Sequence, residues 1–323
     1  MKAEQLIHDK FYVPLSEAVH SLWAVLLPAS YAKYHYRVVN HKRLDLKNPK
    51  DYNEKVQWLK IYSDTASWTA LADKYKVREY VKQCGLENTL VKLFGVWKDA
   101  DEIDFDTLPE KFVLKTNNGC GKNILVYDKH QMDVNQIRKQ LNIWIRKRHE
   151  LVSFQPHMWS IDRRIIAEEL LQDDDTSRIS KSLIDYKFFC FHGEPEVVDV
   201  LFDRKNICIG KGTNINNVHR RERVFDLNWN LRSEVLLSPE PDDISLEIPR
   251  PSLLNEMITI CRVLSKPFPQ VRVDLYQVNN KVYFGELTFT PGGMTDCTEE
   301  FLIEMGNKID LSAVKRRTKL FII

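Results

Sequence analysis

The fold prediction starts from Val271-Arg-Val-Asp-Leu-Tyr276 and the run that follows it, Val282-Tyr-Phe-Gly-Glu-Leu-Thr-Phe-Thr-Pro-Gly-Gly293. In both runs apolar and polar residues alternate, which is typical of β-strands that bury one face. Asn279-Asn280 lies between them, and such residues favour the tight turn of a β-hairpin. The stretch therefore predicts two antiparallel strands joined by a short turn.

The predicted hairpin gathers polar side chains on one face. Alternation sends Arg272 and Asp274 to one face of the first strand, and Glu286 and Thr288 to one face of the second. Neighbouring carboxylates repel each other unless a cation lies between them, and Mg²⁺ prefers oxygen ligands of this kind. The pattern predicts a metal site, with Arg272 beside phosphate oxygens and Pro291-Gly-Gly293 offering backbone N–H groups. The alternative is an exposed hairpin with scattered surface charges.

Whole-chain composition is that of a soluble globular protein. The 323 residues include 47 basic and 45 acidic side chains, a formal net charge of +2, so no overall basic field favours nucleic acid. Six scattered cysteines form no C-x-x-C pair, and no apolar run reaches the roughly 18 residues of a membrane span. The N-terminus does not resemble a signal peptide, so we expect a cytoplasmic protein with reduced thiols.

A second motif is Lys111-Phe-Val-Leu-Lys-Thr-Asn-Asn-Gly-Cys-Gly-Lys-Asn-Ile-Leu-Val126, which predicts a strand, a glycine-bearing turn and a strand. Lys115 lies within an otherwise apolar strand, and a buried ammonium requires an anionic partner. The turn Asn117-Asn-Gly-Cys-Gly-Lys122 can direct several backbone N–H groups at one anion, although it lacks the Walker spacing. The motif fits a lid over nucleotide phosphates, but glycine hairpins also occur without that role.

The remaining segments predict a mixture of helices and strands. Residues 1–36 predict a helix interrupted at Pro28, which either packs on the main body or lies at a membrane interface. Asn53–Tyr62 and Leu71–Val81 predict helices capped by Asn53 and Asp73. Further predicted elements are a basic amphipathic helix at 132–150, a buried strand at 164–171, a hairpin at 185–204, a polar irregular region at 206–242, a helix near 251–265 and a strand or peripheral tether at 314–323.

Together these segments resemble the TupA-like family of ATP-grasp enzymes. The matching segments, in chain order, are Asn53-Glu-Lys-Val-Gln-Trp-Leu59, Asp73-Lys-Tyr-Lys-Val-Arg-Glu-Tyr-Val81, Leu108-Pro-Glu-Lys-Phe-Val-Leu-Lys-Thr-Asn117, Ile166-Ala-Glu-Glu169, Asp185-Tyr-Lys-Phe-Phe-Cys-Phe-His-Gly193, Arg272-Val-Asp-Leu-Tyr276 and Phe284-Gly-Glu-Leu-Thr-Phe-Thr-Pro-Gly292. The resemblance implies an α+β ATP-grasp fold: a mainly helical N-terminal region at 1–70, then two α+β subdomains at 71–165 and 166–323 that clasp ATP.

The resemblance also implies roles for individual residues. Two lysines neutralise the ATP phosphates, the glycine-bearing turn forms the lid, the segment Glu168–Leu171 forms the adenine hinge, and an acid in 172–175 binds the ribose. The cofactor-binding residues that it implies are Lys74, Lys115, Asn118, Gly119, Gly121, Lys122, Glu168, Glu169, Leu170, Leu171 and Asp175. The metal ligands that it implies, for one or two Mg²⁺ ions with Mn²⁺ as a substitute, are Asp274, Glu286 and Thr288. The catalytic residues that it implies are Arg272, Lys187, Gly292 and Gly293.

One position departs from the family pattern. Better-known ATP-grasp ligases carry asparagine where this chain has Thr288. A threonine hydroxyl can bind Mg²⁺, but it is shorter and supplies one oxygen. Thr288 is therefore either a metal ligand or a structural residue, with water completing the metal's octahedron.

The implied activity is that of an ATP-dependent carboxylate–amine ligase in bacterial surface polysaccharide assembly. ATP phosphorylates a carboxylate, and an amine then attacks the acyl phosphate, so the implied partners are a carboxylate-bearing glycan or its precursor and an amino acid or amine. A glycan kinase with the same fold is the first alternative. A glycosyltransferase with Asp173-Asp-Asp175 as its metal motif leaves Lys115 and the hairpin unexplained. A non-catalytic polysaccharide-binding protein would not require the carboxylate pair.

Overall fold

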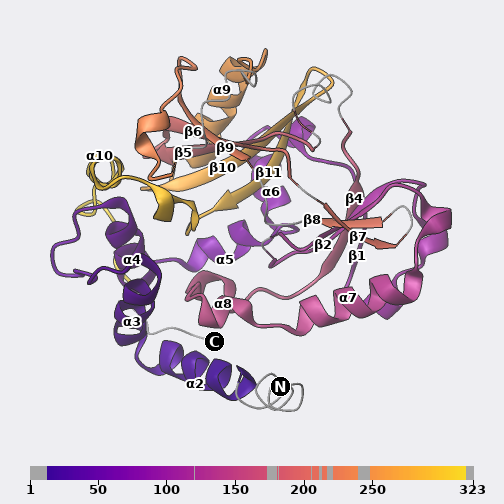
Figure 1. Cartoon of the computed structure of the whole chain (residues 1–323), viewed down its shortest axis with the longest axis horizontal. Helices are drawn as coiled ribbons and strands as arrows, with labels where there is room; N and C mark the ends of the chain where they lie inside the picture. Colours follow the sequence, from indigo (N-terminus) through magenta and orange to yellow (C-terminus); the bar gives the residue numbers. More distant parts are fainter. Residues whose placement is uncertain are drawn as a thin grey trace.

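The computed structural model describes residues 13–119, 121–172, 180, 182–204, 206–210, 213–216, 221–238 and 248–317 (Figure 1). The α-helices are α2 (Val13–Leu26), α3 (Pro28–Asn40), α4 (Tyr52–Tyr62), α5 (Ala66–Ala72), α6 (Val77–Gln83), α7 (Val134–Arg146), α8 (His149–Val152), α9 (Leu254–Ser265) and α10 (Glu299–Asn307). The strands are β1 (Leu93–Trp97), β2 (Phe112–Thr116), β3 (Asn123–Val126), β4 (Ile165–Glu169), β5 (Asp185–Phe191), β6 (Glu194–Phe202), β7 (Asn206–Gly210), β8 (Thr213–Asn216), β9 (Arg221–Asp226), β10 (Val271–Val278) and β11 (Lys281–Thr288).

The strands form two antiparallel sheets. A six-stranded sheet has the order β1-β4-β2-β3-β8-β7, and a five-stranded sheet has the order β11-β10-β5-β6-β9. In Figure 1 the five-stranded sheet lies beneath α9, and α7 runs along the six-stranded sheet. Helices and antiparallel sheets together confirm the α+β class.

The chain passes from one sheet to the other after β4. β4 pairs with β1 and β2, whereas the next strand, β5, pairs with β10 and β6. Later in the chain, β7 and β8 return to the six-stranded sheet through β3. The division at 1–70, 71–165 and 166–323 stays a proposal, and its third part contributes strands to both sheets.

Two apolar cores hold the sheets. One core packs α7 against the six-stranded sheet through residues that include Leu114, Ile124, Ile137 and Leu141. The other core joins the N-terminal helices, the five-stranded sheet, α9 and α10. The N-terminal helices therefore pack against the five-stranded sheet, which begins with β5, later in the chain than the sheet that begins with β1.

The opening hairpin forms as predicted. β10 and β11 are joined by Asn279 and Asn280, which have φ angles of 48° and 59°. Positive φ at both central residues defines the type I′ turn, whose twist matches that of the flanking strands, and asparagine tolerates this conformation. The turn therefore fixes the register that the alternation requires.

Helix boundaries near Lys74 differ from the prediction. Instead of one helix over Leu71–Val81, the chain forms α5 and α6 with a break between them. The Asp73 carboxylate accepts hydrogen bonds from the backbone N–H groups of Tyr75 and Lys76, at 2.8 and 3.2 Å. These local bonds compete with helical ones, so Lys74 lies in the break rather than in a helical first turn. Similarly, the N-cap of α4 is Asp51, not Asn53, and its side chain accepts from the Glu54 N–H.

The region 206–242 is more regular than predicted. β7, β8 and β9 form there, because pairing with β3 and β6 supplies hydrogen-bond partners that are remote in sequence. At the C-terminal tail, Arg316 makes an isolated β-bridge with Ser63, and residues 318–323 lie outside the described ranges. In the described part of the chain, no helix is both long and apolar enough to cross a membrane.

Lys60 provides a stability prediction, because its side chain is buried. Lys60 is 6% exposed, and burial lowers the pKa of its ammonium to about 8. The unfolded chain binds this proton up to its ordinary pKa of about 10.4, so the penalty is present below pH 8 and disappears as pH rises from about 8 to 10.4. We expect Lys60→Met to raise the free energy of unfolding at pH 7 by about 2–3 kcal/mol.

Chemical denaturation between pH 7 and pH 10 tests this expectation. Wild type should gain stability across that range, whereas Lys60→Met should not. Lys98→Met, at an exposed lysine, is the matched control and should behave as wild type. A less stable Lys60→Met protein at pH 7 would contradict the expectation.

Candidate active site

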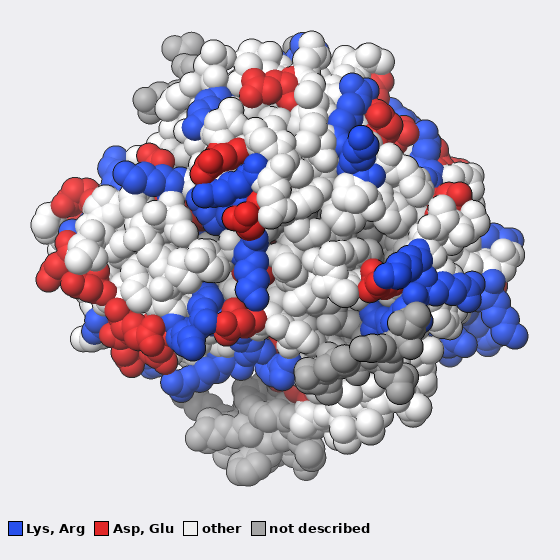
Figure 2. All heavy atoms as spheres, turned by 180° about the vertical axis from the view of Figure 1, so that it is seen from behind, with Lys and Arg blue, Asp and Glu red and all other residues white. Residues whose placement is uncertain are grey.

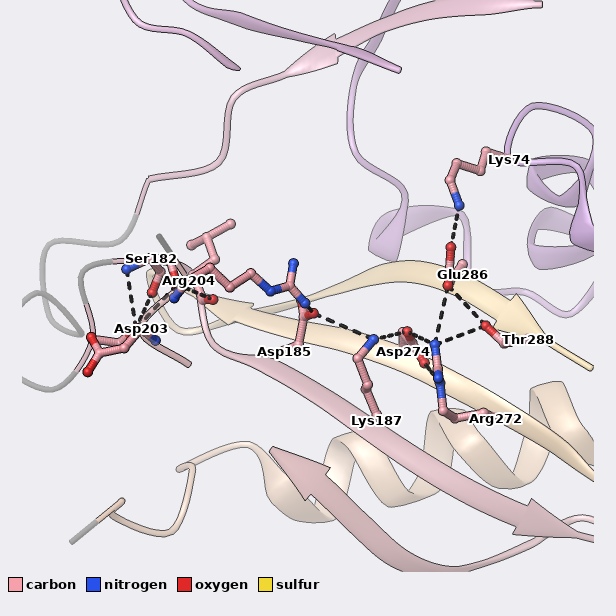
Figure 3. Close-up of polar contacts among 12 residues, drawn as sticks. Lys74, Ser182, Asp185, Lys187, Asp203, Arg204, Arg272, Asp274, Glu286 and Thr288 are labelled. Carbon is pink, nitrogen blue, oxygen red and sulfur yellow. Dashed lines mark hydrogen bonds and ion pairs between the residues drawn. The ribbon is translucent and has the colours of Figure 1, made fainter. Parts of the chain in front are cut away.

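The polar face of β10 and β11 brings four predicted site residues together (Figure 3). Asp274 lies opposite Glu286 in the strand register, and Arg272 lies opposite Thr288. Directly opposed residues of an antiparallel pair project from the same face. The shared face is therefore as the sequence predicts, and the roles of these residues stay predictions.

Three oxygens on this face converge on one cationic nitrogen. Arg272 Nη2 lies 2.7 Å from Asp274 Oδ2, 3.3 Å from Glu286 Oε1 and 3.1 Å from Thr288 Oγ1. Arg272 Nε donates a second bond to Asp274 Oδ1 at 2.7 Å, so the pair is bidentate. Burial lowers the pKa of the guanidinium, but Asp274 and Glu286 raise it above its ordinary value overall. The face can thus surround a positive charge with three oxygens.

Lys187 adds a second cation to the buried part of the site. Lys187 Nζ contacts Asp274 Oδ2, and it lies 3.5 Å from Asp185 Oδ2. Asp185 also contacts Arg204, two residues after the end of β6. Asp274 is only 2% exposed and Lys187 is 8% exposed, so these charges compensate each other away from water.

Lys74 connects the two sheets. Its backbone N–H donates to the Asn117 carbonyl at 3.0 Å, in the turn after β2, while its Nζ contacts Glu286 Oε2 on β11. Burial raises the pKa of Glu286, but Lys74, Lys187 and Arg272 pull it well below its usual range overall. Glu286 is therefore ionised at neutral pH, and through Lys74 it connects β11 to the turn after β2.

On the six-stranded sheet, Lys115 has a protein partner. Lys115 Nζ lies 2.7 Å from Glu168 Oε2, and Arg78 Nη1 lies 3.1 Å from Glu168 Oε1. Arg78 is also fixed by its 2.8 Å bond to the Val91 carbonyl. The anionic partner that the sequence requires for Lys115 is therefore present without a ligand, and it is Glu168.

The glycine-bearing turn has two features of an anion-binding lid. A Cβ at Gly119 would lie 2.3 Å from Thr116 Oγ1, so a larger residue there would require the Thr116 side chain to shift, and Gly121 has a φ of +64°. Asn118 is 6% exposed, and among the described residues its Oδ1 has no hydrogen-bond partner. Buried polar atoms without partners are rare and call for a ligand or water. Lys122 is half-buried at the end of this turn.

The predicted hinge lies on the connection between the sheets. Glu168 is buried, whereas Glu169, the last residue of β4, is exposed. Leu170 and Leu171 are half-buried and follow the strand. Asp175 lies outside the described residues. Gly292 and Gly293 begin the short 3-10 helix after β11, beyond the end of the strand that carries Thr288.

Tyr276 is a site residue that the sequence prediction missed. It follows Arg272 and Asp274 on the same strand face, and a Cβ on Gly285 would lie 2.9 Å from its ring. Burial raises the pKa of Tyr276 to about 12, with contributions from carboxylates of both sheets. Period-two alternation would have placed Tyr276 on this face, so the signal was present.

Arg78 is the second residue that was missed. It is 90 positions from Glu168 in sequence, and no local pattern connects the two. Arg78 lines a cavity of about 770 Å³ together with residues that include Tyr75, Lys76, Lys82 and Leu93. Arg78 thus lies between Glu168 and a cavity at the edge strand β1.

The residue types fit a magnesium ion. Two carboxylates and one hydroxyl are hard oxygen donors, and Arg272 Nη2 marks a point that all three approach. Among the described residues, no group of three or more His, Cys, Asp or Glu side chains could hold a metal. The predicted ligands Asp274, Glu286 and Thr288 would hold an ion only together with oxygens from a bound phosphate or water.

The chain is similar to D-alanine–D-alanine ligase from Bacillus anthracis, with 15% identity over 81% of this chain and 76% of that chain and a TM-score of 0.47. It is also similar to the D-alanine–D-alanine ligase from Helicobacter pylori, with 11% identity over 82% and 68% of the two chains and a TM-score of 0.39. None of the curated proteins matches the sequence. The model of one family, TupA-like ATPgrasp, matches residues 54–310, which is well over half of the sequence, and the chain belongs to this ATP-grasp family.

Proposed function

We propose that this protein is an ATP-dependent carboxylate–amine ligase, which joins an amino acid or other amine to a carboxylate-bearing surface polysaccharide or its precursor. The proposed cofactors are ATP and one or two Mg²⁺ ions, with Mn²⁺ as a substitute. The observation that carries the proposal is the convergence of Asp274, Glu286 and Thr288 oxygens on one cationic nitrogen. A face that already surrounds a cation with three oxygens can accept a metal with its phosphate ligands.

The cations around that face would bind the nucleotide phosphates. Lys74, Lys187 and Arg272 each contact a carboxylate that the metal would take over. Their charges would then be available to phosphate oxygens, and Arg272 would stabilise charge on the transferring phosphoryl group. On the opposite sheet, Lys115 and the lid turn would cover the phosphates, and the ring of Tyr276 would pack against the adenine.

The proposed reaction has two steps. A carboxylate oxygen of the glycan attacks the γ-phosphorus, and the bond from phosphorus to the β–γ bridging oxygen breaks, releasing ADP. The amine nitrogen then attacks the acyl carbon, loses a proton and expels phosphate to leave the amide. Arg272 and Lys187 would stabilise negative charge in the first step, and the backbone N–H groups near Gly292 and Gly293 would orient the acceptor.

Two alternative activities use other chemistry. A glycan kinase would use the same nucleotide site, but a hydroxyl would accept the phosphoryl group and no amide would form. A glycosyltransferase would place its metal at Asp173-Asp-Asp175, which lies outside the described residues. The ion-paired face of the hairpin favours phosphoryl chemistry over both a transferase and a purely glycan-binding protein.

Product analysis tests the proposal. Purified protein is incubated with ATP, Mg²⁺, a panel of amino acids and a panel of uronic-acid glycans. Release of ADP and phosphate that requires both an amine and a glycan is expected. ADP with a phosphorylated glycan would mean a kinase, and release of UDP from a sugar nucleotide would mean a glycosyltransferase; either result overturns the ligase.

Lys115→Met tests the phosphate-binding side of the site. Because Arg78 still compensates Glu168 in this variant, we expect little change in melting temperature. Affinity for a non-hydrolysable ATP analogue should fall about tenfold or more, since a charge-assisted contact to phosphate is lost. Calorimetric titration measures the affinity, with Lys111→Met on the same segment as the control. Equal affinities for wild type and Lys115→Met would remove Lys115 from the site.

A further inference from the structure

The α2–α3 hairpin carries an unusual share of the apolar surface. Half of the large apolar side chains that are exposed among the described residues lie on these two helices and the residue between them. These side chains are Val19, Leu22, Leu26, Leu27, Tyr34, Val38 and Val39. Scattered apolar residues are normal on a protein surface, but a concentration of them marks an interaction site.

Three of these residues form a stripe along α2. Val19, Leu22 and Leu26 are spaced by three and four positions, which places them on one helical face, and they are 56%, 60% and 65% exposed. Leu27 continues the apolar surface at the corner before α3 and is 61% exposed. The acidic residue of α2, Glu17, lies on the opposite side of the helix at 100° per residue.

Contacts between α2 and α3 fix the orientation of the α2 helix and leave the stripe of Val19, Leu22 and Leu26 exposed. The rings of Trp23 and Tyr34 have centroids 4.9 Å apart, and Trp23 and Tyr31 have centroids 5.5 Å apart, so the two helices are tied together. Tyr31 Oη donates to the Val152 carbonyl at 2.7 Å, and Ala24 is fully buried. The stripe is therefore on the outside of a packed helix.

Positive charge accompanies the apolar face. Residues 13–43 contain four Lys or Arg residues and one acidic residue, although the whole chain has nearly equal numbers of each. Lys33 and Arg37 are exposed, lie one turn apart on α3, and make no ion pair within the described part of the chain. The face in Figure 2, seen from behind, shows groups of Lys and Arg beside broad uncharged areas.

We propose that the α2–α3 hairpin docks on an anionic lipid bilayer, with the stripe of Val19, Leu22 and Leu26 in the interface and Lys33 and Arg37 against lipid phosphates. An amphipathic helix with a cationic border binds such a surface without crossing it, through apolar burial and electrostatic attraction. A second copy of the chain is the less suitable occupant, since two hairpins of the same positive charge would repel each other.

Vesicle cosedimentation with the full chain tests the docking. Wild type should bind vesicles of phosphatidylglycerol and phosphatidylcholine, and should bind pure phosphatidylcholine at least about tenfold more weakly. The double variant Leu22→Glu and Leu26→Glu should lose about tenfold or more of the affinity for anionic vesicles, because both side chains are exposed and their loss removes interfacial burial. Ile143→Glu, on the exposed side of α7, is the matched control and should bind as wild type.

A charge-reversal variant separates the two contributions. Lys33→Glu with Arg37→Glu should weaken binding to anionic vesicles by about tenfold and leave any binding to neutral vesicles unchanged. ATP turnover without vesicles should be normal in every variant, because none of these residues lies near the carboxylates of β10 and β11. The proposal would be overturned if the Leu22→Glu, Leu26→Glu variant bound anionic vesicles as tightly as wild type. It would also be overturned if wild type bound no vesicles but formed a dimer in light scattering that this variant abolished.

Discussion

Glu286→Gln is expected to lower ATP turnover in saturating Mg²⁺ by about 10³-fold or more, because an amide cannot replace a carboxylate ligand that is worth several kcal/mol to a metal-assisted transition state. Glu286 is the better of the two carboxylates for this test. The Glu286 side chain is 30% exposed, so the Lys74 ammonium can be solvated by water when the carboxylate is replaced by an amide. ADP release in a coupled assay measures the effect.

The control for this variant is Glu194→Gln, an exposed carboxylate of the same sheet. Asp274→Asn should also abolish turnover. The sequence alone predicts that this variant keeps its fold, but the structure predicts a loss of stability. Asp274 is buried between Arg272 and Lys187, so its loss leaves two buried cations and should cost about 3–5 kcal/mol of stability. If Glu286→Gln kept near wild-type turnover with Mg²⁺, the metal assignment would be wrong.

Arg272→Lys is expected to lower kcat by about 10²-fold or more, with a much smaller change in ATP affinity. Lysine keeps the charge but loses the planar fork that contacts Asp274, Glu286 and Thr288 together. Interactions that strengthen in the transition state act on the rate rather than on substrate binding. Steady-state kinetics and calorimetric titration separate these two quantities.

A purely structural role for Arg272 gives a different result. The bidentate pair with Asp274 would then serve stability alone, so Arg272→Lys would leave kcat unchanged and lower the melting temperature. The matched control is Arg223→Lys, which replaces a buried guanidinium of β9 outside the site. An unchanged kcat with a lowered melting temperature would remove Arg272 from the catalytic residues.

Local patterns predicted the hairpin well, because its face depends on residues two positions apart. Asp274 and Glu286 were placed opposite each other by alternation and one turn, with no information from elsewhere in the chain. The same rule would also have placed Tyr276 on this face. The features that local patterns miss are those that depend on distant partners.

Lys115 and Lys74 show this dependence. The sequence indicates that Lys115 needs an anion but not that Glu168 supplies it, or that Arg78 shares it. The break at Lys74 depends on the Asp73 side chain and on a backbone bond to Asn117, which belongs to the six-stranded sheet. Likewise, the polar sequence of β8 has no strand pattern of its own, and β8 forms because it pairs with β3.

The central claim is that the hairpin face binds ATP through a metal ion. Titration of a non-hydrolysable ATP analogue, with and without Mg²⁺, tests it most directly in wild type and in Glu286→Gln. The account predicts that Mg²⁺ raises the affinity of wild type about tenfold or more and that this gain is lost in Glu286→Gln. An equal gain from Mg²⁺ in both proteins, or none in wild type, would contradict it.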